Sequence, residues 1–169
     1  MAGPAASVIV KFDEAAPKWR ELMTPYASYW HDHDCCGIAD TTLFGGRYAG
    51  ESRPFVGSVD PFRFDPEKYP DDAALSDAVC QHANREFTNS IVVAAMCNQP
   101  VDHQVLCEVL IDLATRLGGI IDFDCLDVPA DVNLQCCEWR FDNVLEWTTI
   151  GTPDEARSWL EHPAFHMLK

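Results

Sequence analysis

The residues best suited to chemistry lie in one short stretch, His31-Asp32-His33-Asp34-Cys35-Cys36. In an extended chain the side chains alternate between two sides, so His31, His33 and Cys35 would share one side. Zinc accepts imidazole nitrogens and thiolates, and a fourth ligand from elsewhere could complete a tetrahedral site. The sequence contains no C-x-x-C pair that would support such a site. We therefore expect a hydrogen-bonded polar loop and no bound metal.

Four carboxylates follow one another at short spacing, and they are Asp122, Asp124, Asp127 and Asp131. A calcium loop needs an oxygen ligand at its fifth position, a glycine at its sixth and a bidentate glutamate at its twelfth. Counted from Asp122, these positions hold Leu126, Asp127 and Asn133. The spacing therefore indicates a solvated acidic face, and we expect no cofactor.

The motifs of nucleophilic and nucleotide-binding enzymes are absent from the sequence: there is no G-x-S-x-G, no Walker A loop and no G-x-G-x-x-G. Eight cysteines and six histidines make chance pairs expected, such as Cys36 with His82 or His103. We expect a protein that is not an enzyme. A small metal- or cysteine-dependent enzyme that uses the stretch 31–36 is the alternative.

The chain carries 27 acidic and 12 basic residues, which gives a formal net charge of −15. Nucleic-acid binding needs a surplus of Lys and Arg to displace counterions, so we expect no nucleic-acid partner. The same charge disfavours an anionic membrane surface, and no run approaches the roughly 20 apolar residues of a spanning helix. We expect no membrane association.

The acidic residues are unevenly distributed along the chain. Five acidic residues and no basic residue lie between Arg116 and Arg140. The negative electrostatic field of such a segment steers a basic protein onto the surface and speeds its association. Tryptophan supplies a large contact area in interfaces, and we expect Trp30 to be exposed for that purpose. The predicted partner-binding residues are Asp122, Asp124, Asp127, Asp131, Trp30, Asp32 and Asp34.

Apolar periodicity in the second half of the chain predicts a β-α-β unit. Buried strands at 91–97 and 120–125 flank a helix that Asp102 caps. In the second strand apolar residues alternate with Asp122 and Asp124, so one face is apolar and the other acidic.

The predicted fold is α+β: a single domain over residues 1–169, with a mainly antiparallel sheet of five or six strands and the helices packed on one face. Four of the eleven prolines lie in 54–70, which predicts an extended surface arm. The other predicted elements are strands at 7–12, 37–44 and 138–150, a glycine-rich turn at 45–50, and helices near 17–23, from Asp71 or Asp72, and from Thr152.

The first ten residues lack the basic and apolar segments of a secretory signal, so we expect a cytoplasmic location. The eight cysteines are spread from Cys35 to Cys137 in a chain long enough to fold without disulfides. We expect them to be reduced.

Two segments carry a family resemblance: LGGIIDF at 117–123 and WLEHPAF at 159–165. In a small acidic α+β chain without catalytic motifs, they resemble the immunity proteins of bacterial polymorphic toxin systems. The resemblance covers mainly residues 90–169. It implies inhibition of one cognate toxin with a basic surface by covering its active site, often the cleft of a nuclease, a deaminase or an ADP-ribosyltransferase. It implies no shared catalytic residues.

Overall fold

A computed structural model gives the structure of the protein and describes residues 3–39 and 52–167. The glycine-rich turn predicted at 45–50 and most of the strand predicted at 37–44 lie outside these residues. In chain order the elements are β1 (Ala5–Val10), α1 (Trp19–Met23), β2 (Ala27–Trp30), β3 (Cys35–Ile38), β4 (Arg53–Pro61), α2 (Pro70–His82), β5 (Asn89–Ala95), α3 (Pro100–Leu117), β6 (Ile120–Asp122), β7 (Gln135–Phe141), β8 (Val144–Gly151) and α4 (Pro153–Leu160).

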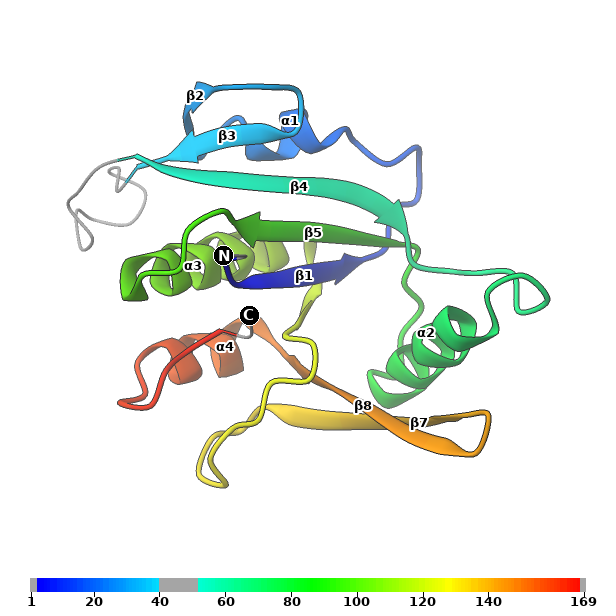
Figure 1. Ribbon diagram of the computed structural model, residues 1–169. Helices are drawn as coiled ribbons and strands as arrows, with labels where there is room; N and C mark the ends of the chain where they lie inside the picture. The colour runs from blue at the N-terminus through cyan, green and yellow to red at the C-terminus, as the bar shows by residue number, and fades with distance from the viewer. Residues whose placement is uncertain (1–2, 40–51, 168–169) are drawn as a thin grey trace.

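In the described residues, all eight strands form one sheet in the order β2-β3-β4-β5-β1-β6-β8-β7 (Figure 1). Each pair of neighbouring strands is antiparallel. Since β1 pairs with both β5 and β6, those two strands run in the same direction with β1 between them. α3 connects β5 to β6. The predicted β-α-β unit is therefore present, with a third strand inserted between its two strands.

The side chains of β1 divide the core between the two faces of the sheet. Val8 and Val10 point to one face and belong to a large cluster that includes residues of α1, α3 and α4. Ile9 points to the other face and packs with residues of α2. All three side chains are fully buried. A strand covered on both faces has to be apolar at consecutive positions, as the run at 8–10 is.

Helix α2 covers the face of the sheet opposite to α3 and α4. Its Val79 and Cys80 pack against Ile9, Cys137 and Ile150. Figure 1 shows α2 beside β7 and β8, apart from the other helices. The single-domain α+β fold with an antiparallel sheet is confirmed, whereas α2 departs from the expectation that the helices share one face. Amphipathic spacing predicts that a helix packs, but not on which face of the sheet.

The prediction of a surface arm at 54–70 is wrong for its first half. β4 is an inner strand between β3 and β5, and its Phe55 is fully buried. Pro54 and Pro61 lie near the two ends of β4, where a missing N–H group removes few hydrogen bonds of the ladder. Prolines at the ends of a segment therefore do not exclude an inner strand.

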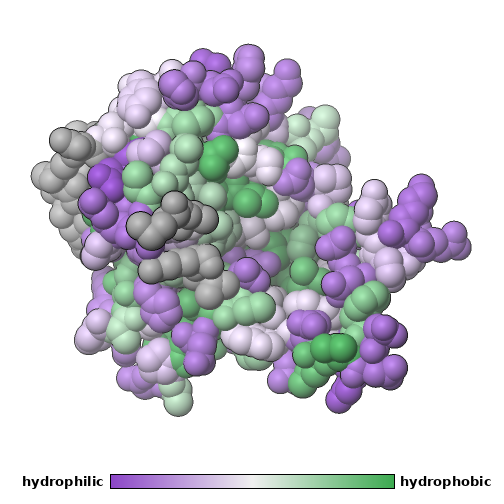
Figure 2. Space-filling view, in the orientation of Figure 1, coloured by the Kyte–Doolittle hydropathy of each residue, from purple (hydrophilic) through white to green (hydrophobic). Residues whose placement is uncertain are grey.

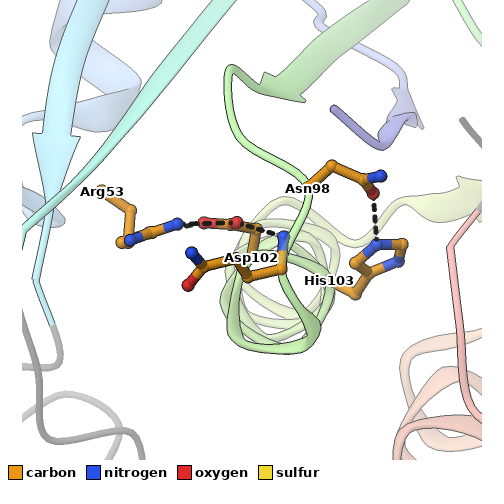
Figure 3. A network of polar contacts seen from close by, with 5 residues as sticks. Arg53, Asn98, Asp102 and His103 are labelled. Carbon is orange, nitrogen blue, oxygen red and sulfur yellow. Dashed lines mark hydrogen bonds and ion pairs between the residues drawn. The ribbon is translucent and has the colours of Figure 1, made fainter. Parts of the chain in front are cut away.

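An ion pair fastens the N-terminus of α3 to β4 (Figure 3). Arg53 donates from Nε to Oδ1 of Asp102 at 2.7 Å and from Nη2 to Oδ2 at 3.0 Å. Asp102 is not the cap but the third residue of the helix, and it accepts the N–H of Gln99, the cap residue, at 2.7 Å. The next residue, His103, hydrogen-bonds to Asn98 at 2.9 Å. Asp102 therefore joins two elements that are distant in sequence.

The Asp102 side chain is only 1% exposed, and its ionisation depends on Arg53. Burial alone would raise the pKa of Asp102, but the hydrogen bonds from Arg53 and Gln99 and the charge of Arg53 lower it below its usual value. The carboxylate is therefore ionised in the folded protein at neutral pH.

Arg53→Met should lower the free energy of unfolding by about 3 to 5 kcal/mol, because it leaves Asp102 buried without its cation. The lowered pKa means that this stabilisation is complete above about pH 4 and is lost as the pH falls through the folded pKa. Urea unfolding at neutral pH and at about pH 3 measures this effect. The difference in the free energy of unfolding between wild type and variant should be smaller at about pH 3 than at neutral pH.

The control for this experiment is Arg140→Met, which removes an exposed arginine that has no ion pair within the described part of the chain. It should change stability by no more than about 0.5 kcal/mol. Equal losses in both variants would contradict the role given to the ion pair.

Candidate protein interface

The structure separates the predicted binding residues into two groups. Trp30 ends β2, and Asp32 and Asp34 lie in the turn between β2 and β3. The second group lies in β6 and the loop that follows it, and consists of Asp122, Asp124, Asp127 and Asp131. Because β4, β5 and β1 lie between β3 and β6, the groups are at least four strand spacings apart, roughly 19 Å. The structure does not bring the two groups together at one site.

The stretch 31–36 is a hairpin turn and the start of β3, so the extended arrangement considered for zinc is wrong. The N–H groups of His31 and Asp32 both donate to the carbonyl oxygen of Cys35, at 3.1 and 3.3 Å. In the part of the chain that the structure describes, no group of three or more His, Cys, Asp or Glu side chains is placed to hold a metal ion. Trp30 is half-buried rather than exposed, and the guanidinium of Arg20 lies 4.6 Å from its ring centre.

The thiol considered as a nucleophile, that of Cys36, is a buried side chain. All eight cysteines are free, as predicted. Burial raises the pKa of Cys36 to about 11, so little nucleophilic thiolate is present at neutral pH. The two histidines considered as its partners are bound elsewhere: His82 hydrogen-bonds to Gln135 at 2.7 Å, and Nδ1 of His103 accepts the N–H of Met167 at 2.9 Å.

Asp122 does not present a free charge to solvent. Its half-buried carboxylate accepts the hydroxyl of Thr148 at 2.5 Å and the N–H of Asp124 at 2.9 Å, both on Oδ1. Burial raises the pKa of Asp122, although these two hydrogen bonds act in the opposite direction. β6 ends at Asp122, and Asp124 has a left-handed backbone with φ of 58°. The expected acidic face of a continuing strand is therefore not formed.

The loop after β6 is fastened to β8 by Thr149. The backbone of Thr149 accepts the N–H of Phe123 and donates to the carbonyl of Asp124, both at 2.8 Å. Its hydroxyl donates to the carbonyl of Leu126 at 2.6 Å. The far end of the loop is also held, by a side-chain hydrogen bond to α4. Asp127, which follows Leu126, is thereby placed beside the β7–β8 hairpin.

A shallow hollow of about 340 Å³ lies between this loop and the hairpin, and we call it the hairpin hollow. Asp127 lines it from the loop, while Glu138 and Trp147 line it from directly opposite positions on β7 and β8. The carboxylates of Asp127 and Glu138 have no hydrogen bond or ion pair within the described residues. The remaining lining residues are Leu126, Val128, Leu134, Cys136 and Thr149.

Exposed apolar side chains continue along the hairpin beyond the hollow. Leu145, which shares the face of Trp147 two residues away on β8, is 50% exposed, and Val144, on the opposite face, is 55% exposed. Figure 2 shows hydrophobic side chains among hydrophilic ones over β7 and β8, at the lower right. Asp131 differs from Asp127, because it lies 3.5 Å from the imidazole of His162. An exposed apolar patch with a polar rim is typical of a surface that binds another protein.

Glu138 and Trp147 are not among the site residues predicted from the sequence. Asp142 and Asn143, which join β7 to β8, have φ values of 46° and 67°. Positive φ at both central residues is the mark of a two-residue type I′ hairpin turn. The Asp-Asn pair is thus the signal that could have predicted the hairpin and placed Glu138 opposite Trp147.

The fold and this surface define a single-sheet α+β protein with a candidate site for binding another protein. The chain matches DUF6368, a family of unknown function, over residues 2–169, and it belongs to that family. No curated protein and no solved structure matches it. Among the described helices, none has both the length and the apolar character that crossing a membrane requires.

Asp122→Asn should raise the unfolding temperature at neutral pH. Because the folded pKa is raised, ionised Asp122 reduces stability as the pH rises above the unfolded pKa of about 3.9. Asparagine can accept the same two hydrogen bonds without the charge. The gain should disappear at about pH 3. Asp127→Asn is the control and should give no gain, and a lower unfolding temperature for Asp122→Asn at neutral pH would contradict the assignment.

Thr149→Val should lower the free energy of unfolding by about 1 to 3 kcal/mol, because the buried carbonyl of Leu126 loses its donor. The amide of Leu126 should also exchange its hydrogen faster, since the loop is no longer fastened to β8 at that point. Thr115→Val, at an exposed helical position, serves as the control. Unchanged exchange at Leu126 would show that the hydroxyl does not hold the loop.

Proposed function

We propose that this chain is an immunity-type binding protein that neutralises a cognate basic toxin by covering the active site of the toxin. The partner is a protein, of the class that contains nucleases, deaminases and ADP-ribosyltransferases, and the complex forms in the cytoplasm. The contact surface is acidic and centres on the β7–β8 hairpin and the loop at 123–134.

One observation carries the proposal: two carboxylates without a partner in the described chain lie next to exposed apolar side chains. The exposed acids Asp65, Asp77 and Asp154 instead lie within 4 Å of an arginine or a lysine. Asp127 and Glu138 have no such neighbour, although Leu145 and Trp147 lie close along the same hairpin. An interface needs apolar contact area for affinity and unpaired charge for steering, and this surface offers both.

The net charge of −15 supports the choice of a basic partner. A protein with this charge attracts a basic cleft over a long range and repels acidic surfaces, so charge selects the partner before contact is made. A basic cleft that binds nucleic acid or nucleotides provides the complementary field. Covering such a cleft needs no chemistry from the inhibitor, which suits a chain without catalytic motifs.

The functional test uses the toxin candidate encoded beside the gene for this chain. Its expression in a bacterial host should stop growth, and co-expression of this chain should restore it. The two proteins should also form a stoichiometric complex, and the isolated toxin domain should lose its activity in that complex. A neighbouring product that is not toxic, or that stays active and unbound, would reject the proposed function.

Replacing Asp124 and Asp127 by Asn and Glu138 by Gln should slow association with the toxin by about tenfold at low ionic strength. The rate of the wild type should fall more steeply with added salt than that of the variant, because salt screens exposed charges within about 10 Å at 0.1 M. Stopped-flow measurements at several salt concentrations give both quantities.

The matched control removes three charges elsewhere, with Asp13→Asn, Glu14→Gln and Glu67→Gln at exposed positions outside the hairpin. This control tests whether the location of the charge matters beyond the total. If both triple variants slow association equally, the partner responds to net charge alone and does not bind at the hairpin.

A further inference from the structure

We infer that the hairpin hollow is a binding site for one arginine side chain of the partner protein. This inference rests on the proposed function for the identity of the partner, but the site itself consists of described residues of this chain. It assigns a ligand class, the guanidinium group, to a hollow of about 340 Å³. That volume is at the low end of the range of roughly 300 to 1,000 Å³ for small-ligand pockets, which suits a single side chain.

The hollow combines an aromatic side chain with aliphatic ones. Trp147 is half-buried and lines the hollow together with Leu126, Val128 and Leu134. Indole is the aromatic group with the strongest attraction for a cation over its face. The aliphatic side chains provide contact for the methylene groups of a long basic side chain. A small inorganic cation would leave these apolar contacts unused.

Two carboxylates line the hollow from different segments. Glu138 is directly opposite Trp147 in the ladder, where side chains of a cross-strand pair lie about 5 Å apart. Asp127 comes from the loop that Thr149 fastens to β8. Neither carboxylate has a hydrogen bond or ion pair in the described chain, so an incoming cation displaces no internal partner.

This combination fits arginine better than lysine. A guanidinium is planar, so it can stack on the indole and still donate in its own plane to carboxylates on two sides. An ammonium is a compact and strongly hydrated charge, and it loses more hydration than guanidinium when it lies on an aromatic face. The chain's own Arg140 is two residues from Glu138 on β7, yet it forms no ion pair within the described residues. The hollow therefore stays available for an arginine from another protein.

The inference can be tested by NMR. The ¹⁵N-labelled protein is titrated with N-acetyl-L-argininamide and, in parallel, with N-acetyl-L-lysinamide. The signal of the Trp147 indole N–H, assigned by its loss in Trp147→Phe, reports on the hollow. The arginine compound should shift this signal saturably with a dissociation constant in the millimolar range, and the lysine compound should bind at least about threefold more weakly. In the variant Asp127→Asn with Glu138→Gln, binding of the arginine compound should weaken at least about tenfold.

The control variant Asp13→Asn with Glu14→Gln keeps the hollow and should bind the arginine compound as the wild type does. The spectra themselves show whether each variant is folded. No shift of the Trp147 signal, equal binding of the two compounds, or unchanged binding in the double variant of the hollow would each overturn the inference. If the toxin binds and is neutralised but the hollow does not bind the arginine compound, the inference alone fails. If the hollow binds the arginine compound and no toxin is neutralised, the proposed function alone fails.

Discussion

The structure depends on the complete enclosure of β1. This strand pairs with β5 and β6 on its two edges, and side chains of helices cover both of its faces. This enclosure requires that α3 connect β5 to β6 across one face of β1. It also requires that α2 cover the other face. The β7–β8 hairpin is added beyond β6. On the face turned away from α2, side chains of this hairpin stay exposed, because they are not needed to bury β1.

The carboxylates of the chain have two distinct roles in this arrangement. Asp102 and Asp122 are internal groups that accept hydrogen bonds from Arg53 and Thr148 and connect neighbouring elements. Asp127 and Glu138 accept none in the described residues and remain available to another molecule. The formal charge of the chain therefore does not describe the proposed binding surface. On that surface two carboxylates without a partner in the described residues, Asp127 and Glu138, lie beside the exposed apolar side chains of the hairpin.

Local patterns in the sequence predict the elements whose formation depends on neighbouring residues. The helix predicted from Thr152 is confirmed with its capping box to Glu155, and the apolar periodicity of α3 is confirmed over most of its length. The position of β4 inside the sheet and the face covered by α2 could not be predicted. Both depend on pairings between segments far apart in the chain, which local periodicity does not contain.

The sequence predicted the region of the candidate site but not all of its residues. Charge distribution alone pointed to Asp127, whereas Glu138 and Trp147 become a pair only through the register of the hairpin. Asp122 turns inward because Thr148, 26 residues later in the chain, donates a hydrogen bond to it. Whether a carboxylate is internal or available depends on such distant donors, so acidic patterning could locate the region but not the individual residues.

The position of β7 at the edge of the sheet has a consequence for divergence within the family. β7 pairs with β8 alone, and the side chains that it contributes to the hollow lie on the face turned away from α2. Substitutions there leave the buried side chains around β1 in place. The β7 residues of the hollow therefore contribute little to the core, so the proposed recognition and the folding of the chain place separate demands on the sequence. Under the proposed function, a gene duplicate could acquire a new partner through a few changes in one hairpin while the rest of the molecule stays unaltered.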